Sequence, residues 1–125
     1  MRLKIPAFVI APLYALILAS FAHAQSKTEV VNVEVRPGVT MRYLALSPDA
    51  PPKAAVILLA SGNNVLRLSP SGSIGTNLSL NFLIRSRQLF VNEGLYAVAL
   101  DVASDRPGGM DGLIRLSPQY ARDLG

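Results

Sequence analysis

Two neighbouring stretches early in the chain alternate between apolar and polar residues. Every second residue from Val31 to Val35 is a valine, with polar residues between them, and residues 39 to 46 alternate in the same way. A period of two is typical of a strand that buries one face. The pair Pro37-Gly38 separates the two stretches and favours a tight turn. The pattern therefore predicts an antiparallel hairpin.

Two later stretches are apolar without alternation, and a segment with helical spacing separates them. Residues 54–60 and 95–100 contain only apolar side chains, apart from the hydroxyl of Tyr96, as expected of central strands in a parallel sheet. Between them, Asn77 to Glu93 predicts an amphipathic helix that ends at Gly94. Its apolar face consists of Phe82, Leu83, Ser86, Leu89 and Phe90. This order predicts a βαβ unit with parallel strands and a right-handed crossover.

Together these elements predict an α/β fold, a mixed sheet in which an antiparallel hairpin precedes the parallel βαβ unit. A flavodoxin-like or Rossmann half would also supply a βαβ unit, but the hairpin before the first buried strand argues against both. Near the end, Ser117-Pro118 has the composition of a helix start. The sequence stops at Gly125, about one turn later, so we expect a truncated piece of a longer protein.

The first residues have the three parts of an export signal. Arg2 and Lys4 form a basic tip, residues 5–21 are largely apolar, and Ala22-His23-Ala24 fits the A-x-A cleavage pattern. The apolar part is interrupted by two prolines and is short for a membrane span, which needs about 20 residues. We therefore expect residues 1–24 to be a cleaved signal peptide and the mature protein to be periplasmic or secreted, with no stable membrane anchor after cleavage.

The composition narrows the chemistry that remains after cleavage. The chain has no cysteine, and its only histidine is His23, inside the signal. Thiol catalysis, histidine bases and sites with Cys or His ligands are therefore excluded within the mature polypeptide, and we expect no metal and no cofactor. Loss of Arg2 and Lys4 lowers the formal net charge from +4 to +2. The other basic residues are scattered, so nucleic acid is not an expected partner.

Candidate chemistry lies in the loops after the two buried strands, where ligands gather in open α/β sheets. The first loop is Ser61-Gly62-Asn63-Asn64, whose glycine allows a sharp turn and whose N–H groups could face a developing oxyanion. A plain polar turn is the alternative. Asp101, Asp105 and Asp111 could suggest a metal site or a general acid, but their surroundings favour turn residues that are solvated or paired locally.

A second loop comes close to a catalytic motif. Ser71-Gly72-Ser73-Ile74-Gly75 differs from the nucleophile elbow G-x-S-x-G at its first position. An elbow needs a hydrophobic strand directly before it, whereas Arg67-Leu68-Ser69-Pro70 precedes this segment. We therefore interpret it as a loop.

The order of elements resembles the N-terminal half of the α/β-hydrolase fold, most closely small exported bacterial members of the dienelactone-hydrolase-like or lipase-like kind. Residues 55–64 and 94–108 carry the resemblance, which extends from Val30 to the end. It implies that residues 25–125 are the N-terminal part of an α/β-hydrolase-like domain. It also implies that the backbone N–H groups of Gly62 and Asn63 form half of an oxyanion hole, although Ser61 stands where the family often has histidine.

The resemblance implies a serine hydrolase that acts on a small ester-like or acyl substrate once the protein is complete. In that family the nucleophile elbow follows a fifth strand, and the acid and histidine come later. No residue of this chain is therefore assigned a catalytic role, and the chain is expected to be inactive by itself. The alternative is a non-catalytic exported α/β module for binding or interaction.

Overall fold

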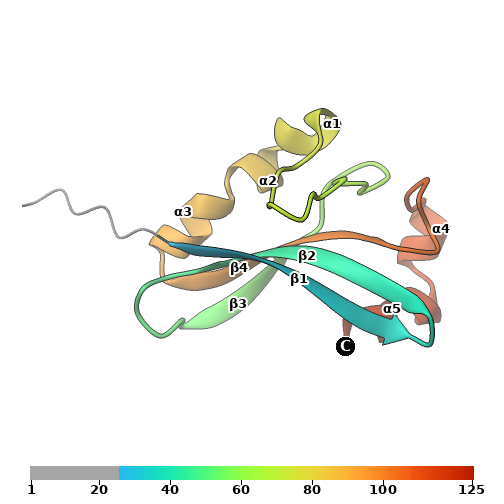
Figure 1. Ribbon diagram of the computed structural model, residues 1–125, viewed down its shortest axis with the longest axis horizontal. Coiled ribbons are helices and arrows are strands. Elements are labelled where there is room, and N and C mark those ends of the chain that lie inside the picture. Colours follow the sequence, from blue (N-terminus) through green and yellow to red (C-terminus); the bar gives the residue numbers. More distant parts are fainter. Residues whose placement is uncertain (1–25) are drawn as a thin grey trace, which may run out of the picture.

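The computed structural model describes residues 26–125, of which Thr76 and Asn77 are described by their backbone alone. These residues form a mixed four-stranded sheet with helices on both sides (Figure 1). The predicted signal peptide, residues 1–24, lies outside the described residues. Among the described residues, no helix has both the length and the apolar character needed to cross a bilayer.

The predicted hairpin is confirmed. Strand β1 (Lys27–Arg36) pairs antiparallel with β2 (Val39–Ser47), with Val31 opposite Tyr43. Gly38 closes the turn with a φ of 74°, a left-handed conformation that glycine adopts without steric cost. A register shift between Glu34 and Arg36 interrupts the ladder just before the turn. The hairpin therefore pairs with itself, as the predicted mixed sheet requires.

The two apolar strands are parallel, as predicted, but they occupy different positions in the sheet. The strand order is β1-β2-β4-β3, so β4 (Leu95–Ala103) lies in the interior and β3 (Ala54–Leu58) at an edge. β4 pairs antiparallel with β2 and parallel with β3. The prediction that β3 is a central strand covered on both faces is therefore wrong. Only one of its faces is covered by the helices, and Ile57 on the other face is half exposed.

The single helix predicted over residues 77–93 is instead three short helices. They are α1 (Thr76–Ser79), α2 (Phe82–Arg85) and α3 (Arg87–Asn92). Asn81 causes the first break because its backbone is extended and its side chain accepts hydrogen bonds from the N–H groups of Leu83 and Ile84, which makes it the N-cap of α2. Gly94 ends the segment with a φ of 82°, as predicted.

These breaks change which side chains face the sheet. Ile84 and Val91 are 0% and 5% exposed, whereas Phe82 and Leu89 of the predicted apolar face are 67% and 64% exposed. Phe90 does pack against the core, as predicted. The prediction failed for Phe82 and Leu89 because a helical period holds only while the helix is continuous. The core on this face also contains Leu44, Leu46, Leu58, Leu66, Ala97 and Ala99.

The opposite face of the sheet is covered at one end. Helices α4 (Gly112–Arg115) and α5 (Pro118–Leu124) pack there, and Tyr120 of α5 joins Met41, Leu100, Ala103 and Met110 in a second core (Figure 1). The predicted helix start is confirmed, since Ser117 caps α5 by accepting a hydrogen bond from Tyr120 N–H. The rest of this face is an apolar groove of about 320 Å³, lined by Val33, Tyr43, Ile57, Tyr96, Val98 and Leu124 among others.

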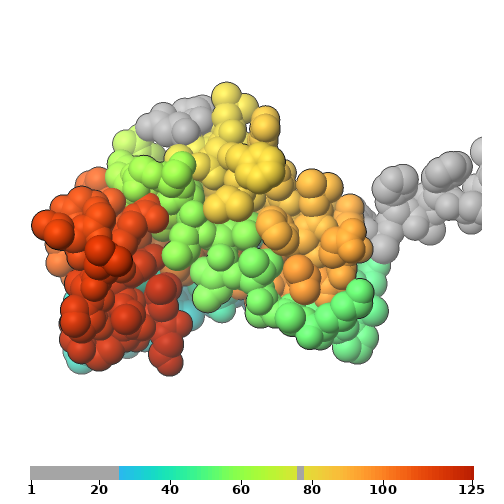
Figure 2. All heavy atoms as spheres, turned by 180° about the vertical axis from the view of Figure 1, so that it is seen from behind, coloured from blue at the N-terminus to red at the C-terminus, as the bar shows by residue number. Residues whose placement is uncertain are grey.

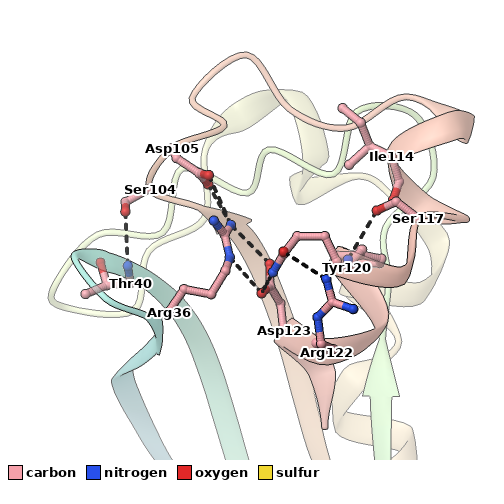
Figure 3. A network of polar contacts seen from close by, with 10 residues as sticks. Arg36, Thr40, Ser104, Asp105, Ile114, Ser117, Tyr120, Arg122 and Asp123 are labelled. Atoms are coloured by element: carbon pink, nitrogen blue, oxygen red, sulfur yellow. Dashed lines mark hydrogen bonds and ion pairs between the residues drawn. The ribbon is translucent and has the colours of Figure 1, made fainter.

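An ion-pair cluster fastens α5 to the hairpin (Figure 3). The Arg36 guanidinium donates to both carboxylate oxygens of Asp123, at 2.9 and 3.2 Å, and to Asp105, at 3.0 and 3.2 Å. The hydrogen bond to Asp123, followed by the one to Asp105, raises the pKa of Arg36. Burial alone would raise the pKa of Asp123, but hydrogen bonds from Arg36 and Gln119 and the charges of Arg36 and Arg122 outweigh it, so this pKa is lowered.

The cluster makes the docking of α5 sensitive to acid. Because the pKa of Asp123 is lower in the folded chain than in the unfolded chain, its contribution is complete above the ordinary aspartate pKa of about 3.9 and is lost as the pH falls through the lower folded value. We expect the difference in unfolding free energy between the unmodified chain and Arg36→Gln to shrink over this window. Urea unfolding in a pH series that runs from pH 7 to well below pH 3 measures it, with Arg106→Gln as control. A difference that does not change with pH would contradict the prediction.

Candidate active-site loop

The predicted oxyanion loop, Ser61–Asn64, follows β3 and is contacted by the N-cap residue of α2 and by a residue of α4. Figure 2 shows the green residues of this region between the yellow residues of α1 and α2 and the orange-red residues that lead into α4. Two side chains connect the loop to those helices. Asn81 Nδ2 donates to Ser61 Oγ at 2.9 Å, and Arg115 of α4 donates to loop carbonyls from the other side.

Several contacts to the loop come from α4 and from the segment that leads into it. Arg115 Nη2 lies 2.9 Å from the carbonyl oxygen of Ala60 and 2.6 Å from that of Gly62. Met110 N–H donates to the carbonyl of Asn63 at 2.9 Å. Gly109 packs so closely that a Cβ there would lie 2.5 Å from both Cβ and the carbonyl oxygen of Asn63. The loop is therefore fixed by groups that lie about fifty residues later in the chain.

The side chain of Asn64 holds the loop against β4. Its side chain is fully buried, and its Nδ2 donates to the carbonyl of Leu100 in β4 at 3.2 Å. Its backbone has a φ of 58°, a left-handed conformation in which asparagine is more frequent than most residues. Among the described residues, its Oδ1 has no hydrogen-bond partner. The loop thus leaves β3 through one sharp reversal at Gly62, whose φ is 74°, and a second at Asn64.

The two predicted oxyanion donors, Gly62 and Asn63, are exposed at the top of this loop. Within residues 26–125, no acceptor is hydrogen-bonded to the backbone N–H of either residue. N–H groups that are held in a fixed orientation and have no internal partner are suited to stabilise negative charge on a substrate oxygen. The chemical capacity of the loop is therefore donation of hydrogen bonds, and it supplies neither a nucleophile nor a base.

Asp101 is not a turn residue, so this expectation is corrected. It lies inside β4 and is only 8% exposed. Its carboxylate accepts hydrogen bonds from the N–H groups of Leu66 and Leu68, at 2.8 and 2.9 Å, and from its neighbour Val102 at 2.8 Å. In a sheet, carbonyl groups of a neighbouring strand would accept these hydrogen bonds. Here the Asp101 carboxylate accepts them from the irregular segment that follows Asn64. Asp101 therefore has a structural role next to the loop.

The other two aspartates have separate positions. Asp111 caps α4 by accepting a hydrogen bond from Ile114 N–H at 2.9 Å, which agrees with a role at a turn. Asp105 is an exposed turn residue after β4, as predicted. Its ion-pair partner is Arg36 of β1 and not its neighbour Arg106. Among the described residues, no group of three acidic, histidine or cysteine side chains is placed to hold a metal ion.

The segment Ser71–Gly75 is a loop, as predicted. The residues directly before it are not part of a strand. Ser69 organises the segment, since its Oγ accepts a hydrogen bond from Ser73 N–H at 2.9 Å and contacts Ser71 Oγ at the same distance. Ser73 is therefore not presented at the end of a strand in the way that a nucleophile elbow requires.

Sequence reasoning missed the side chains that hold the loop Ser61–Asn64. Asn81 carries a recognisable signal, because asparagine before Phe-Leu-Ile is typical of an N-cap. Arg115 carries none, since an arginine between isoleucine and leucine gives no indication of a partner so far away in sequence. Neither the protein-family models, nor the curated proteins, nor the solved structures that were compared with this chain match it.

Proposed function

We propose that this chain is the N-terminal part of an exported α/β hydrolase, a serine hydrolase whose substrate is a small ester or another acyl compound. In this proposal the N–H groups of Gly62 and Asn63 stabilise the oxyanion of the acyl-transfer intermediate. The nucleophile, acid and histidine come from chain beyond Gly125, so residues 1–125 are inactive by themselves.

The observation that carries the proposal is a loop after β3 whose carbonyls are held by Arg115 and Met110 and whose Gly62 and Asn63 N–H groups have no hydrogen-bond partner within residues 26–125. In an α/β hydrolase, part of the oxyanion hole comes from the loop that follows the third strand. The sheet agrees with this assignment, because an antiparallel β2 lies beside a β4 that returns between β2 and β3. This arrangement fits the first half of such a sheet, with β3 at the edge where a fifth strand would add.

The DNA beyond the codon for Gly125 tests the proposal first. We expect it to encode a strand followed by G-x-S-x-G, and later an aspartate or glutamate and a histidine. The protein expressed with that continuation should hydrolyse a p-nitrophenyl ester, whereas the 125-residue chain should not. A stop codon directly after Gly125 would contradict the proposal and favour the non-catalytic binding module.

A matched pair of variants tests the role of the loop in the longer protein. Asn63→Pro removes the backbone donor, while Asn63→Ala keeps it, and both lose the hydrogen bond from Val65 N–H to Asn63 Oδ1. Loss of one oxyanion donor lowers kcat by about 10²–10³-fold in a serine hydrolase. We therefore expect this loss in Asn63→Pro and only a small change in Asn63→Ala. Equal activity of the two variants would remove Asn63 from the oxyanion hole.

Export is a separate prediction. We expect protein recovered from the periplasm or the medium to begin at Gln25, because Ala22-His23-Ala24 fits the cleavage pattern after an apolar segment with a basic tip. Mass spectrometry of the intact protein measures the N-terminus. Protein that retains Met1 and stays in the membrane fraction would contradict this prediction without affecting the assignment of the loop.

A further inference from the structure

We infer that Arg115 is the residue that positions the Asn63 N–H, by fixing the peptide plane that contains it. The inference rests on the proposed function only where it treats that N–H as the oxyanion donor. The geometry itself stands on four contacts between the loop and the segment that ends in α4. They involve Arg115, Met110 and Gly109 on one side and the backbone of residues 60–63 on the other.

The guanidinium of Arg115 is committed to the loop. A single nitrogen, Nη2, donates to the carbonyls of Ala60 and Gly62 at 2.9 and 2.6 Å, and short distances of this kind are typical of hydrogen bonds from a charged donor. Within the part of the chain that the structure describes, Arg115 forms no salt bridge with a carboxylate. Its positive charge therefore acts on these two carbonyl dipoles.

Peptide planarity converts this contact into an orientation of the donor. The carbonyl of Gly62 and the N–H of Asn63 belong to the same peptide unit, and the described residues contain only trans peptides. In a trans peptide the C=O and N–H bonds point in opposite directions. Because Arg115 draws the Gly62 carbonyl toward α4, the Asn63 N–H points away from α4, toward the exposed side of the loop.

The same contact strengthens the donor. A cation hydrogen-bonded to a carbonyl polarises the peptide unit, and hydrogen bonds in series reinforce one another. The guanidinium of Arg115 is hydrogen-bonded to the Gly62 carbonyl, and this carbonyl shares its peptide unit with the Asn63 N–H. The polarisation therefore extends from the guanidinium to the Asn63 N–H. The next peptide is held as well, because the Asn63 carbonyl accepts from Met110 N–H. The two peptide planes that flank Asn63 are therefore both held by residues 110–115.

A role limited to fastening α4 is the competing explanation. This explanation has a basis in the structure. Leu113 of α4 and the C-cap residue Leu116 are largely exposed, and Ile114 is the one residue of α4 that packs against the second core. The two roles differ in what happens to Asn63. If Arg115 only fastens the helix, its loss should mobilise α4 and leave the Asn63 N–H oriented by Met110 and Gly109.

The test compares Arg115→Met with Arg122→Met in ¹⁵N-labelled protein recovered after export, at concentrations where it is monomeric. Arg122 loses the same charge, but its described hydrogen bond is to Gln119 on its own helix. Residual dipolar couplings report the direction of the Asn63 N–H bond, and relaxation reports its order parameter. In Arg115→Met we expect a changed coupling and an order parameter that falls from about 0.85 to below about 0.6. Residues of β2 and β4 should keep their couplings, and Arg122→Met should match the unmodified chain.

Unchanged coupling and order at Asn63 in Arg115→Met would overturn the inference, even if α4 becomes mobile. If Arg115→Met does not fold, the same measurement is made on Arg115→Gln. Glutamine is shorter and neutral, so its amide cannot hold the carbonyls of both Ala60 and Gly62. A folded Arg115→Gln with an undisturbed Asn63 would then overturn the inference. Arg115→Lys restores a cation with several donors and should recover the coupling. A separate experiment tests the proposed function. Full activity of Asn63→Pro in the longer protein would contradict that function, but it would not change the result of the measurement on Arg115→Met.

Discussion

Replacing Asp101 by alanine is expected to lower the free energy of unfolding by about 3–5 kcal/mol, within the range of substitutions that break a buried hydrogen-bond network. The carboxylate accepts hydrogen bonds from three backbone N–H groups, those of Leu66, Leu68 and Val102. Leu66 and Leu68 are themselves buried, so water cannot easily replace the lost acceptor. Hydrogen bonds to a charged group are stronger than neutral ones, and an unsatisfied buried donor adds the cost of its desolvation.

Urea unfolding followed by circular dichroism measures this effect, with Asp49→Ala in an exposed loop as the matched control. Asp101→Asn is the more selective variant, because it keeps the shape of the side chain but places an amide NH₂ against one of the backbone donors. It should therefore recover only part of the loss. A change of less than about 1 kcal/mol in Asp101→Ala, typical of an ordinary hydrogen bond, would show that the segment from Leu66 to Leu68 does not depend on this carboxylate.

Gly109→Ala is expected to cost about 2–4 kcal/mol, because left-handed backbone strain adds to a steric clash. Gly109 has a φ of 97°, a conformation that residues with a side chain rarely adopt. The new Cβ would lie 2.5 Å from the Asn63 backbone oxygen and 2.8 Å from Val65 Cγ2. Backbone atoms cannot move aside as a flexible side chain can, so the loop Ser61–Asn64 must shift.

Gly108→Ala provides the control, since its Cβ would meet no atom within 4 Å and its φ is not positive. The two variants add the same methyl group at adjacent positions, so a difference between their unfolding midpoints isolates the contact with Asn63. In the longer protein, Gly109→Ala should also reduce ester hydrolysis, while Gly108→Ala should not. Equal stability of the two variants would mean that the loop after β4 accommodates the methyl group without disturbing Asn63.

The hairpin and the parallel pair could be predicted because their signals are local. Alternation and a Pro-Gly turn define β1 and β2, and two apolar runs on either side of a helical segment define β3 and β4. The position of each strand in the sheet could not be predicted in this way. Both apolar runs lack alternation, so periodicity could not reveal that β4 is central and β3 lies at an edge, with one face left in the apolar groove.

The candidate loop could be located from sequence, but the groups that shape it could not. Gly62 and Asn63 come shortly after an apolar run of residues, which is a local signal. The contacts from Gly109, Met110 and Arg115 depend on the tertiary path of the chain after β4. Asp101 was recognised as a residue at the end of an apolar run, yet two of its three hydrogen bonds arise because the segment from Leu66 to Leu68 returns over the sheet.

The position of β4 between β2 and β3 also determines the order in which the sheet can assemble. The hairpin has its partners close together in the chain, and hairpins form in about 1–10 μs. Neither β2 nor β3 can complete its pairing until β4 arrives, and the ladders of β4 join residues distant in sequence. Proteins dominated by such distant pairings fold in about milliseconds to seconds. A chain that crosses a membrane N-terminus first would therefore deliver the hairpin early and keep the rest of its sheet open until residues 95–103 emerge.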